Sequence, residues 1–194
     1  MRANLKKSYL IGLLLLFSLA VPLLQSLLFS TKTEGAIKID KEIKADFLLS
    51  KKKYLLVYFG YVGCSDVCTP FLQKLSQLYD SKKFQNIKED TDVFFINLTP
   101  EVEEALPQRF AKFFHKDFIG VHLSKKKIYS LDRTFDLFFA EDLRDKTELN
   151  HTDNLFFLTN YSGIKTLKSI HFTHPLSTEK LIDAIIYEKK NPIQ

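Results

Sequence analysis

The chain has 194 residues, of which 45% are hydrophobic and 26% are charged, and it contains only six glycines and six prolines. This composition excludes a disordered or low-complexity protein, and the length favours one domain with a substantial core. The formal net charge is +5, but three unopposed cations stand in the first thirty residues, so the remainder is close to neutral and nucleic-acid binding is not supported.

The first segment predicts a membrane anchor. From Tyr9 to Phe29 the residues are almost entirely apolar, and a helix of about 21 residues can cross a bilayer. Positive residues precede this run, so we expect a single-pass protein of the bacterial inner membrane with a cytoplasmic N-terminus and a periplasmic domain. A cleaved signal peptide is the less favoured alternative. The expected organisation is an anchor over 1–30, a tether over 31–43 and a folded domain over 44–194.

The folded part begins with alternating strands and helices. Residues 54–59 form a continuous apolar run, as in a strand buried on both faces. After a short loop, Thr69 and Pro70 suit the N-cap and first residue of a helix, and apolar residues recur at helical spacing up to Tyr79. Residues 92–98 then predict a second buried strand.

The same alternation continues towards the C-terminus. In chain order we expect a helix opened by Thr99–Pro100–Glu101, a strand over 118–121, a helix around 128–131, a polar loop over 141–150, a hairpin of strands 155–159 and 164–170, and a helix from Ser177 to Tyr187. This order predicts an α/β protein of thioredoxin-like fold, with a central mixed sheet and flanking helices, preceded by one transmembrane helix.

Cys64 and Cys68 are the only cysteines, and both lie in the loop between the first predicted strand and helix. Thiolates at the start of a helix are stabilised by its free N–H groups. Three residues separate the pair, whereas thioredoxin-type exchangers have two. The placement predicts a dithiol for redox chemistry or for a soft metal. A structural disulfide in a binding module is the least favoured alternative, because it would close only a short loop.

Ligand number and softness favour copper among the metals. Two thiolates satisfy a linear Cu(I) site, and one added imidazole makes a three-coordinate site. A structural zinc site needs four ligands, and the five histidines show no clustered spacing with the cysteines.

The cysteine loop also resembles a known family. Residues 58–69, YFGYVGCSDVCT, are similar to the copper-site motif of the SCO/SenC proteins, which are copper chaperones and thiol-redox factors of cytochrome c oxidase assembly. Further similar segments follow in the same order: FFINLTPE at 94–101, DFIG at 117–120 and NHT at 150–152. The resemblance covers roughly residues 44–187.

This resemblance implies a metal site and a partner. Cys64 and Cys68 match the two thiolate ligands, and His151 matches an imidazole ligand on a mobile loop. Asp66 would lie near the metal or at a docking surface, without binding the metal. The cargo would be copper as Cu(I), with Cu(II) left open. The partner would be the copper-binding subunit of cytochrome c oxidase or another copper chaperone. No similar match supports the remaining histidines, which we expect at the surface or in the core: His115, His122, His171 and His174.

The chain departs from the family pattern around the site. Ser65 and Thr69 replace the prolines that usually follow the cysteines, and Asn150 and Thr99 replace acidic residues. These changes remove charge and rigidity but no ligand. Tyr61 either packs the loop or lines the site.

Two functions stay open at this point. One is a metallochaperone, which is not an enzyme. The other is a thiol-disulfide oxidoreductase, in which Cys64 and Cys68 form a redox-active dithiol that reduces target cysteines before they receive metal.

Overall fold

The computed structural model describes residues 17–18, 20–21, 35–143, 145 and 148–192. The chain divides into two compact units, residues 1–34 and 35–194, and the second unit is the folded domain. No helix in the described ranges is long and apolar enough to cross a membrane. The membrane segment predicted over 9–29 lies outside the described residues except at 17–18 and 20–21.

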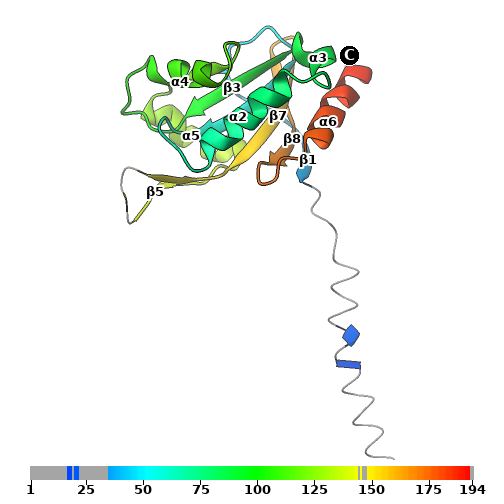
Figure 1. Ribbon diagram of the computed structural model, residues 1–194, viewed down its shortest axis with the longest axis horizontal. Coiled ribbons are helices and arrows are strands. Elements are labelled where there is room, and N and C mark those ends of the chain that lie inside the picture. The colour runs from blue at the N-terminus through cyan, green and yellow to red at the C-terminus, as the bar shows by residue number, and fades with distance from the viewer. Residues whose placement is uncertain (1–16, 19, 22–34, 144, 146–147, 193–194) are drawn as a thin grey trace, which may run out of the picture. The chain divides into compact units, whose positions relative to one another are not determined.

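Strands and helices alternate along most of the domain (Figure 1). The described strands are β1 (Ala36–Ile43), β2 (Tyr54–Gly60), β3 (Thr91–Asn97), β4 (Ile119–Val121), β5 (Phe139–Glu141), β6 (Leu149–His151), β7 (Asn154–Tyr161) and β8 (Ile164–Phe172). The described helices are α2 (Cys68–Tyr79), α3 (Gln85–Lys88), α4 (Leu106–Phe114), α5 (Lys125–Phe135) and α6 (Thr178–Lys190).

The main sheet is mixed, as the sequence predicts. Its strand order is β1-β8-β7-β2-β3-β4, in which β2, β3 and β4 pair in parallel and the other neighbours pair antiparallel. Strands β5 and β6 form a separate two-stranded sheet. The turn between β7 and β8 has positive φ at Ser162 (53°) and Gly163 (84°), which is the geometry of a tight hairpin turn.

Two hydrophobic cores lie on opposite faces of the main sheet. Alternate residues of β2 face opposite sides, so Tyr58 joins the core beneath α2 and α6, whereas Phe59 joins the core beneath α5. Figure 1 shows α2 and α6 on the near face of the sheet, and α5 behind it. Fully burying a Leu or Phe side chain contributes roughly 1.5–3 kcal/mol, so these two layers fix the frame that carries the cysteine loop.

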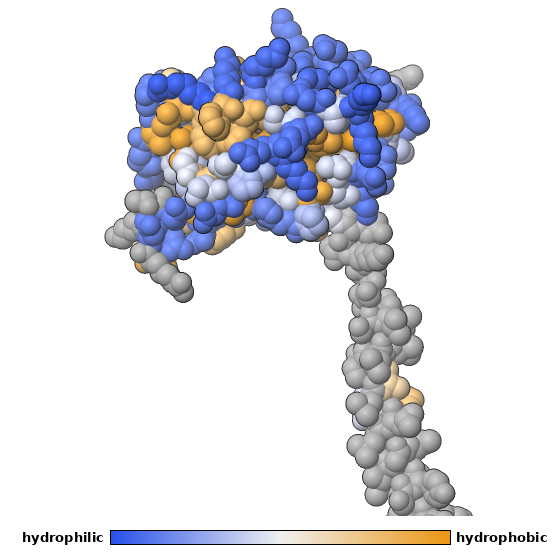
Figure 2. All heavy atoms as spheres, in the orientation of Figure 1, coloured by the Kyte–Doolittle hydropathy of each residue, from blue (hydrophilic) through white to orange (hydrophobic). Residues whose placement is uncertain are grey.

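The surface of the near face is mostly hydrophilic (Figure 2). Apolar residues gather over α4, where Phe113 is 79% exposed. A single exposed aromatic residue is common on soluble domains and needs no special explanation.

Three element boundaries differ from the sequence-based expectation. Residues 36–43, predicted as part of a tether, form the edge strand β1 on β8, and Ile37 and Ile39 alternate with charged residues as edge strands often do. The helix expected after Thr99 begins only at Leu106, with Pro107 in its first turn. The helix expected to begin after Thr69 begins at Cys68, with Val67 at the N-cap position.

The polar loop predicted over 141–150 connects the two strands of a β-ribbon. Its ends belong to β5 and β6, and Phe139 pairs with His151 and Glu141 with Leu149. The ribbon projects from the body of the domain (Figure 1). His151 is therefore carried by a short strand.

Candidate metal centre

The two cysteines lie where β2 passes into α2. Cys64 is 3% exposed and Cys68 is fully buried, and both are free thiols. A Cβ atom on Gly60 would lie 2.8 Å from the Cys68 sulfur and 3.1 Å from the Phe95 ring. Glycine at the end of β2 is therefore what lets the sulfur sit against the sheet.

Hydrogen bonds hold the loop that carries Cys64. The Cys68 N–H donates to the Cys64 sulfur at 3.3 Å, and the Thr69 hydroxyl donates to the Cys64 carbonyl at 2.8 Å. On the other side, the Val62 N–H donates to Oδ1 of the fully buried Asn97 at 3.0 Å. The loop is thus tied both to the first turn of α2 and to the end of β3.

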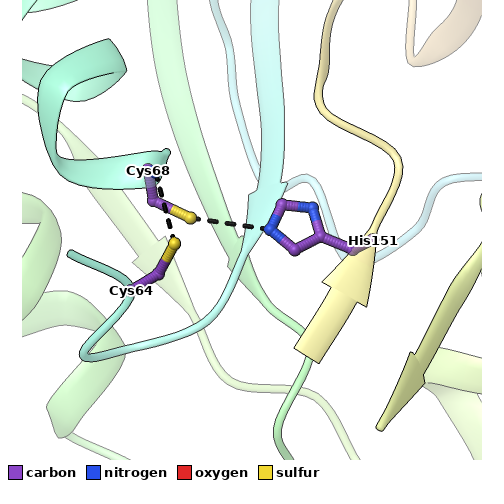
Figure 3. Close-up of side chains that lie close together, drawn as sticks. All are labelled: Cys64, Cys68 and His151. Atoms are coloured by element: carbon purple, nitrogen blue, oxygen red, sulfur yellow. Dashed lines mark hydrogen bonds between the residues drawn. The ribbon is translucent and has the colours of Figure 1, made fainter. Parts of the chain in front are cut away.

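His151 approaches the cysteines from the ribbon (Figure 3). Its Nε2 lies 3.6 Å from the Cys68 sulfur, although 83 residues separate the two in sequence. Its Nδ1 lies 3.0 Å from the Thr152 carbonyl oxygen, and only a protonated Nδ1 can donate to that acceptor. In the neutral ring this hydrogen bond places the proton on Nδ1, so the lone pair of Nε2 is available to bind a metal.

The three donor atoms fit one small metal ion. The ligand atoms of Cys64, Cys68 and His151 all lie within 4.8 Å of one another. Metal–sulfur and metal–nitrogen bonds of about 2.0–2.3 Å place three trigonal donors roughly 3.5–4 Å apart. Two thiolates and one imidazole suit a soft ion, and among the described residues no Asp, Glu, Cys or His joins them as a fourth ligand.

The two thiols differ strongly in acidity. The pKa of Cys64 is lowered to about 4, because the Cys68 thiol, His151 and the N–H groups at the start of α2 donate to its sulfur and outweigh the effect of burial. The pKa of Cys68 is raised, by its hydrogen bond to Cys64 and by burial. Burial alone would lower the pKa of His151, but the hydrogen bond to Cys64 raises it. Cys64 is therefore the cysteine that is ionised to a thiolate at neutral pH.

Two tyrosines border the centre. The Tyr61 hydroxyl donates to the Glu148 carboxylate, and the Tyr61 ring meets the His151 ring edge to face at 5.9 Å. Tyr61 therefore lines the site. The Tyr58 hydroxyl donates to Oδ1 of Asp153 at 2.7 Å beneath the cysteines, and burial raises the pKa of Tyr58.

The structure brings together the three residues that the family resemblance implies as ligands. Among the described residues, Cys64, Cys68 and His151 are the only group of three or more Cys, His, Asp or Glu side chains whose donor atoms lie close enough to hold a metal ion. Asp66 is exposed, accepts a hydrogen bond from the Ser65 hydroxyl and is not part of this group. The other histidines bind elsewhere: His115 to Asp80, His122 to the Pro100 carbonyl, His171 to Ser169 and His174 to Asp153.

Sequence reasoning missed Asn97, Glu148 and Asp153. The hydrogen-bond partner of Asn97 is 35 residues away in sequence. Glu148 and Asp153 each bond to a tyrosine, at separations of 87 and 95 residues. Polar residues of this kind show no local pattern. Only the polar identity of Asn97 inside an apolar strand was a usable signal.

Comparison with known proteins identifies the family to which the chain is similar. The SCO1/SenC family model matches residues 45–186. The mitochondrial SCO1 homologue of Homo sapiens is 27% identical over 142 residues, which cover 71% of this chain and 44% of that protein. The chain spans about half the length of the curated relatives it matches.

Solved structures share the fold. ScoI of Arabidopsis thaliana, crystallised with copper bound, aligns with a TM-score of 0.59 and 23% identity over 72% of this chain and 85% of that chain. The solution structure of apo Sco1 from Thermus thermophilus aligns with a TM-score of 0.56 and 22% identity over 81% of this chain and 94% of that chain.

Proposed function

This chain belongs to the SCO1/SenC family, and we propose that it binds copper through Cys64, Cys68 and His151 and delivers it during cytochrome c oxidase assembly. The convergence of two thiol sulfurs and one free imidazole nitrogen within 4.8 Å carries this proposal. The similarity to a copper-bound structure of the same fold supports it. The soft donor set favours Cu(I).

The fold holds the three donor residues with different degrees of packing. Cys68 is part of the core beneath α2, whereas His151 belongs to a two-stranded ribbon with three-residue strands. Transfer can then proceed by ligand exchange. A partner thiolate forms a bond to copper as the bond to the His151 nitrogen breaks, while both cysteine sulfurs keep their bonds until the partner has two.

We place this activity at the outer face of a membrane. The apolar run over 9–29 and the positive residues before it support a single-pass anchor with the domain in the periplasm. The recipient would be the copper-binding subunit of cytochrome c oxidase or another copper chaperone.

Anaerobic Cu(I) titration of the reduced full-length chain, against a chromophoric competitor, tests the site. We expect one tightly bound ion, loss of that binding in Cys64→Ser, and affinity about 10–100-fold weaker in His151→Ala. His122→Ala is the matched control, because His122 lies outside the group and contacts the Pro100 carbonyl, so its removal should leave affinity unchanged. Unaltered stoichiometric binding by Cys64→Ser would refute the proposal.

A thiol-disulfide oxidoreductase is the second candidate, favoured by the opposite pKa shifts of the two cysteines. The Cys64 thiolate would attack a target disulfide, breaking its S–S bond and forming a mixed disulfide. Cys68 would then lose its proton and attack Cys64, which releases the target as a dithiol and leaves a Cys64–Cys68 disulfide. Two electrons pass to the target, and an external dithiol must reduce the chain again.

His151→Ala separates the two functions. Copper binding that is lost while reduction of a model disulfide persists, together with normal oxidase assembly, favours the redox function. Failed assembly with intact disulfide reduction favours delivery.

A further inference from the structure

An acidic groove runs beside the metal centre. Two adjacent cavities of about 190 and 290 Å³ meet at Tyr129 of α5 and Phe139 of β5. One wall is the face of α5 that carries Lys125, Tyr129 and Asp132 at helical spacing, and the other wall is the β5–β6 ribbon. The rings of Tyr129 and Phe139 lie 5.6 Å apart and form a wall that both cavities share, and the two cavities together are called the groove.

The lining of this groove is unbalanced in charge. Lys125 is the one cation among the described lining residues. The carboxylates that line it are Glu101, Asp132, Asp136, Glu141 and Glu148. Aromatic side chains stand among them, with Tyr129 61% exposed and Phe138 64% exposed. A complementary surface would be basic and would offer apolar side chains.

The groove is connected to the ligand His151 in two ways. Phe139, on its wall, pairs with His151 across the ribbon. Glu148, also on its wall, accepts the hydroxyl of Tyr61, whose ring lies against the His151 ring. An occupant of the groove would thus contact the residues that position the most loosely held donor.

The shape favours a polypeptide segment over a single ion. The lining carboxylates come from separate elements: the loop after β3, α5 with its C-cap residue, and the ribbon. Among the described residues they do not form a group that converges on one point. Metal-binding clusters among the described residues are limited to the centre already described. Among the described strands β5 pairs only with β6, so none of them covers its other edge, and an extended chain can pair at such an edge.

We propose that this groove binds an extended, basic segment of the protein that exchanges copper with Cys64, Cys68 and His151. The inference rests on the proposed function, which it deepens by assigning the docking surface. Docking here brings the partner to the ribbon side of the centre, where His151 leaves.

Copper transfer kinetics test the proposal. The donor is the Cu(I)-loaded full-length chain in detergent, and the acceptor is the copper-free copper-binding domain of the cytochrome c oxidase subunit from the same organism. The charge variant is Asp132→Lys combined with Glu141→Lys, and its matched control is Glu42→Lys combined with Asp183→Lys on β1 and α6. The apolar variant is Tyr129→Ser, and its control is Tyr187→Ser, since both tyrosines are 61% exposed.

We expect the charge variant to transfer copper about tenfold more slowly at low salt and to lose the salt dependence of the wild-type rate. Tyr129→Ser should also slow transfer, and all four variants should keep the wild-type Cu(I) affinity. Wild-type transfer rates in both groove variants would overturn the docking surface alone. A wild-type chain that binds no copper or transfers none would refute the proposed function and this inference together. A wild-type dimer that dissociates in the charge variant would show that a second copy fills the groove, which also overturns the proposal.

Discussion

Acid should destabilise the folded domain through one buried histidine, His171. This side chain of β8 is fully buried, its Nε2 lies 2.8 Å from the Ser169 hydroxyl oxygen, and its Nδ1 has no hydrogen-bond partner. Burial lowers the pKa of His171 from 6.5 to about 4, because the charged ring would lose its hydration. The folded state therefore keeps His171 neutral where the unfolded chain protonates it.

The sign and size of the effect follow from these two pKa values. Above about pH 6.5 neither state binds the proton, and the contribution to stability is complete. As the pH falls below 6.5 the unfolded state takes up the proton first, so the free energy of unfolding decreases. The loss amounts to about 2 kcal/mol at pH 5 and ~3 kcal/mol at pH 4, where the folded state begins to protonate as well.

Urea unfolding at several pH values between 4 and 7.5 measures this contribution. His171→Phe keeps a ring of similar shape and removes the titrating group. As the pH falls, the free energy of unfolding of the wild type should therefore decrease by these amounts relative to that of the variant. At neutral pH the variant should be about 1–3 kcal/mol less stable, because the buried Ser169 hydroxyl loses its hydrogen-bond partner. Ser169→Ala is the control, since it removes the same hydrogen bond and keeps the histidine. Parallel stability curves for wild type and His171→Phe across this pH range would refute the reasoning.

Three further predictions concern the metal centre. Because the pKa of Cys64 is lowered to about 4, the ultraviolet absorbance of about one thiolate should persist in the reduced apo chain down to pH 5 and vanish in Cys64→Ser. Gly60→Ala places a methyl group 2.8 Å from the Cys68 sulfur, so Cu(I) affinity measured by competition should fall about tenfold or more; unchanged affinity would show that the sulfur can move freely. Tyr61→Phe removes the hydrogen bond to Glu148, worth about 1 kcal/mol, and amide exchange in β6 should become about fivefold faster; equal exchange rates would mean that the ribbon is held by other contacts.

The central part of the fold was predictable because its signals are local. Strands β2 and β3 are buried on both faces, so their sequences contain continuous apolar runs. Strand β1 was missed because six of its eight residues are exposed and it depends on pairing with β8, more than a hundred residues away. The three-residue strands β5 and β6 are too short to show a period.

The sequence predicted some residues of the site and not others. The placement of Cys64 and Cys68 before a helix indicated reactive or metal-binding thiols by itself. His151 came from the family resemblance, because nothing in its neighbourhood distinguishes it from the other histidines until the fold brings it 3.6 Å from Cys68. The supporting contacts of Asn97 and Glu148 are set by tertiary structure alone.

Cys68 is held in the core and His151 on the ribbon, and this difference sets the order in which the metal donors can be exchanged. Moving Cys68 would open a core that includes Tyr58 and Phe95, and removing such side chains from their packing costs several kcal/mol. Moving His151 displaces a two-stranded ribbon, and two-stranded elements are marginally stable on their own. Free energies of local opening differ accordingly within one domain. His151 should therefore leave first, Cys64 next and Cys68 last, which requires an acceptor to approach from the ribbon side, where the acidic groove lies.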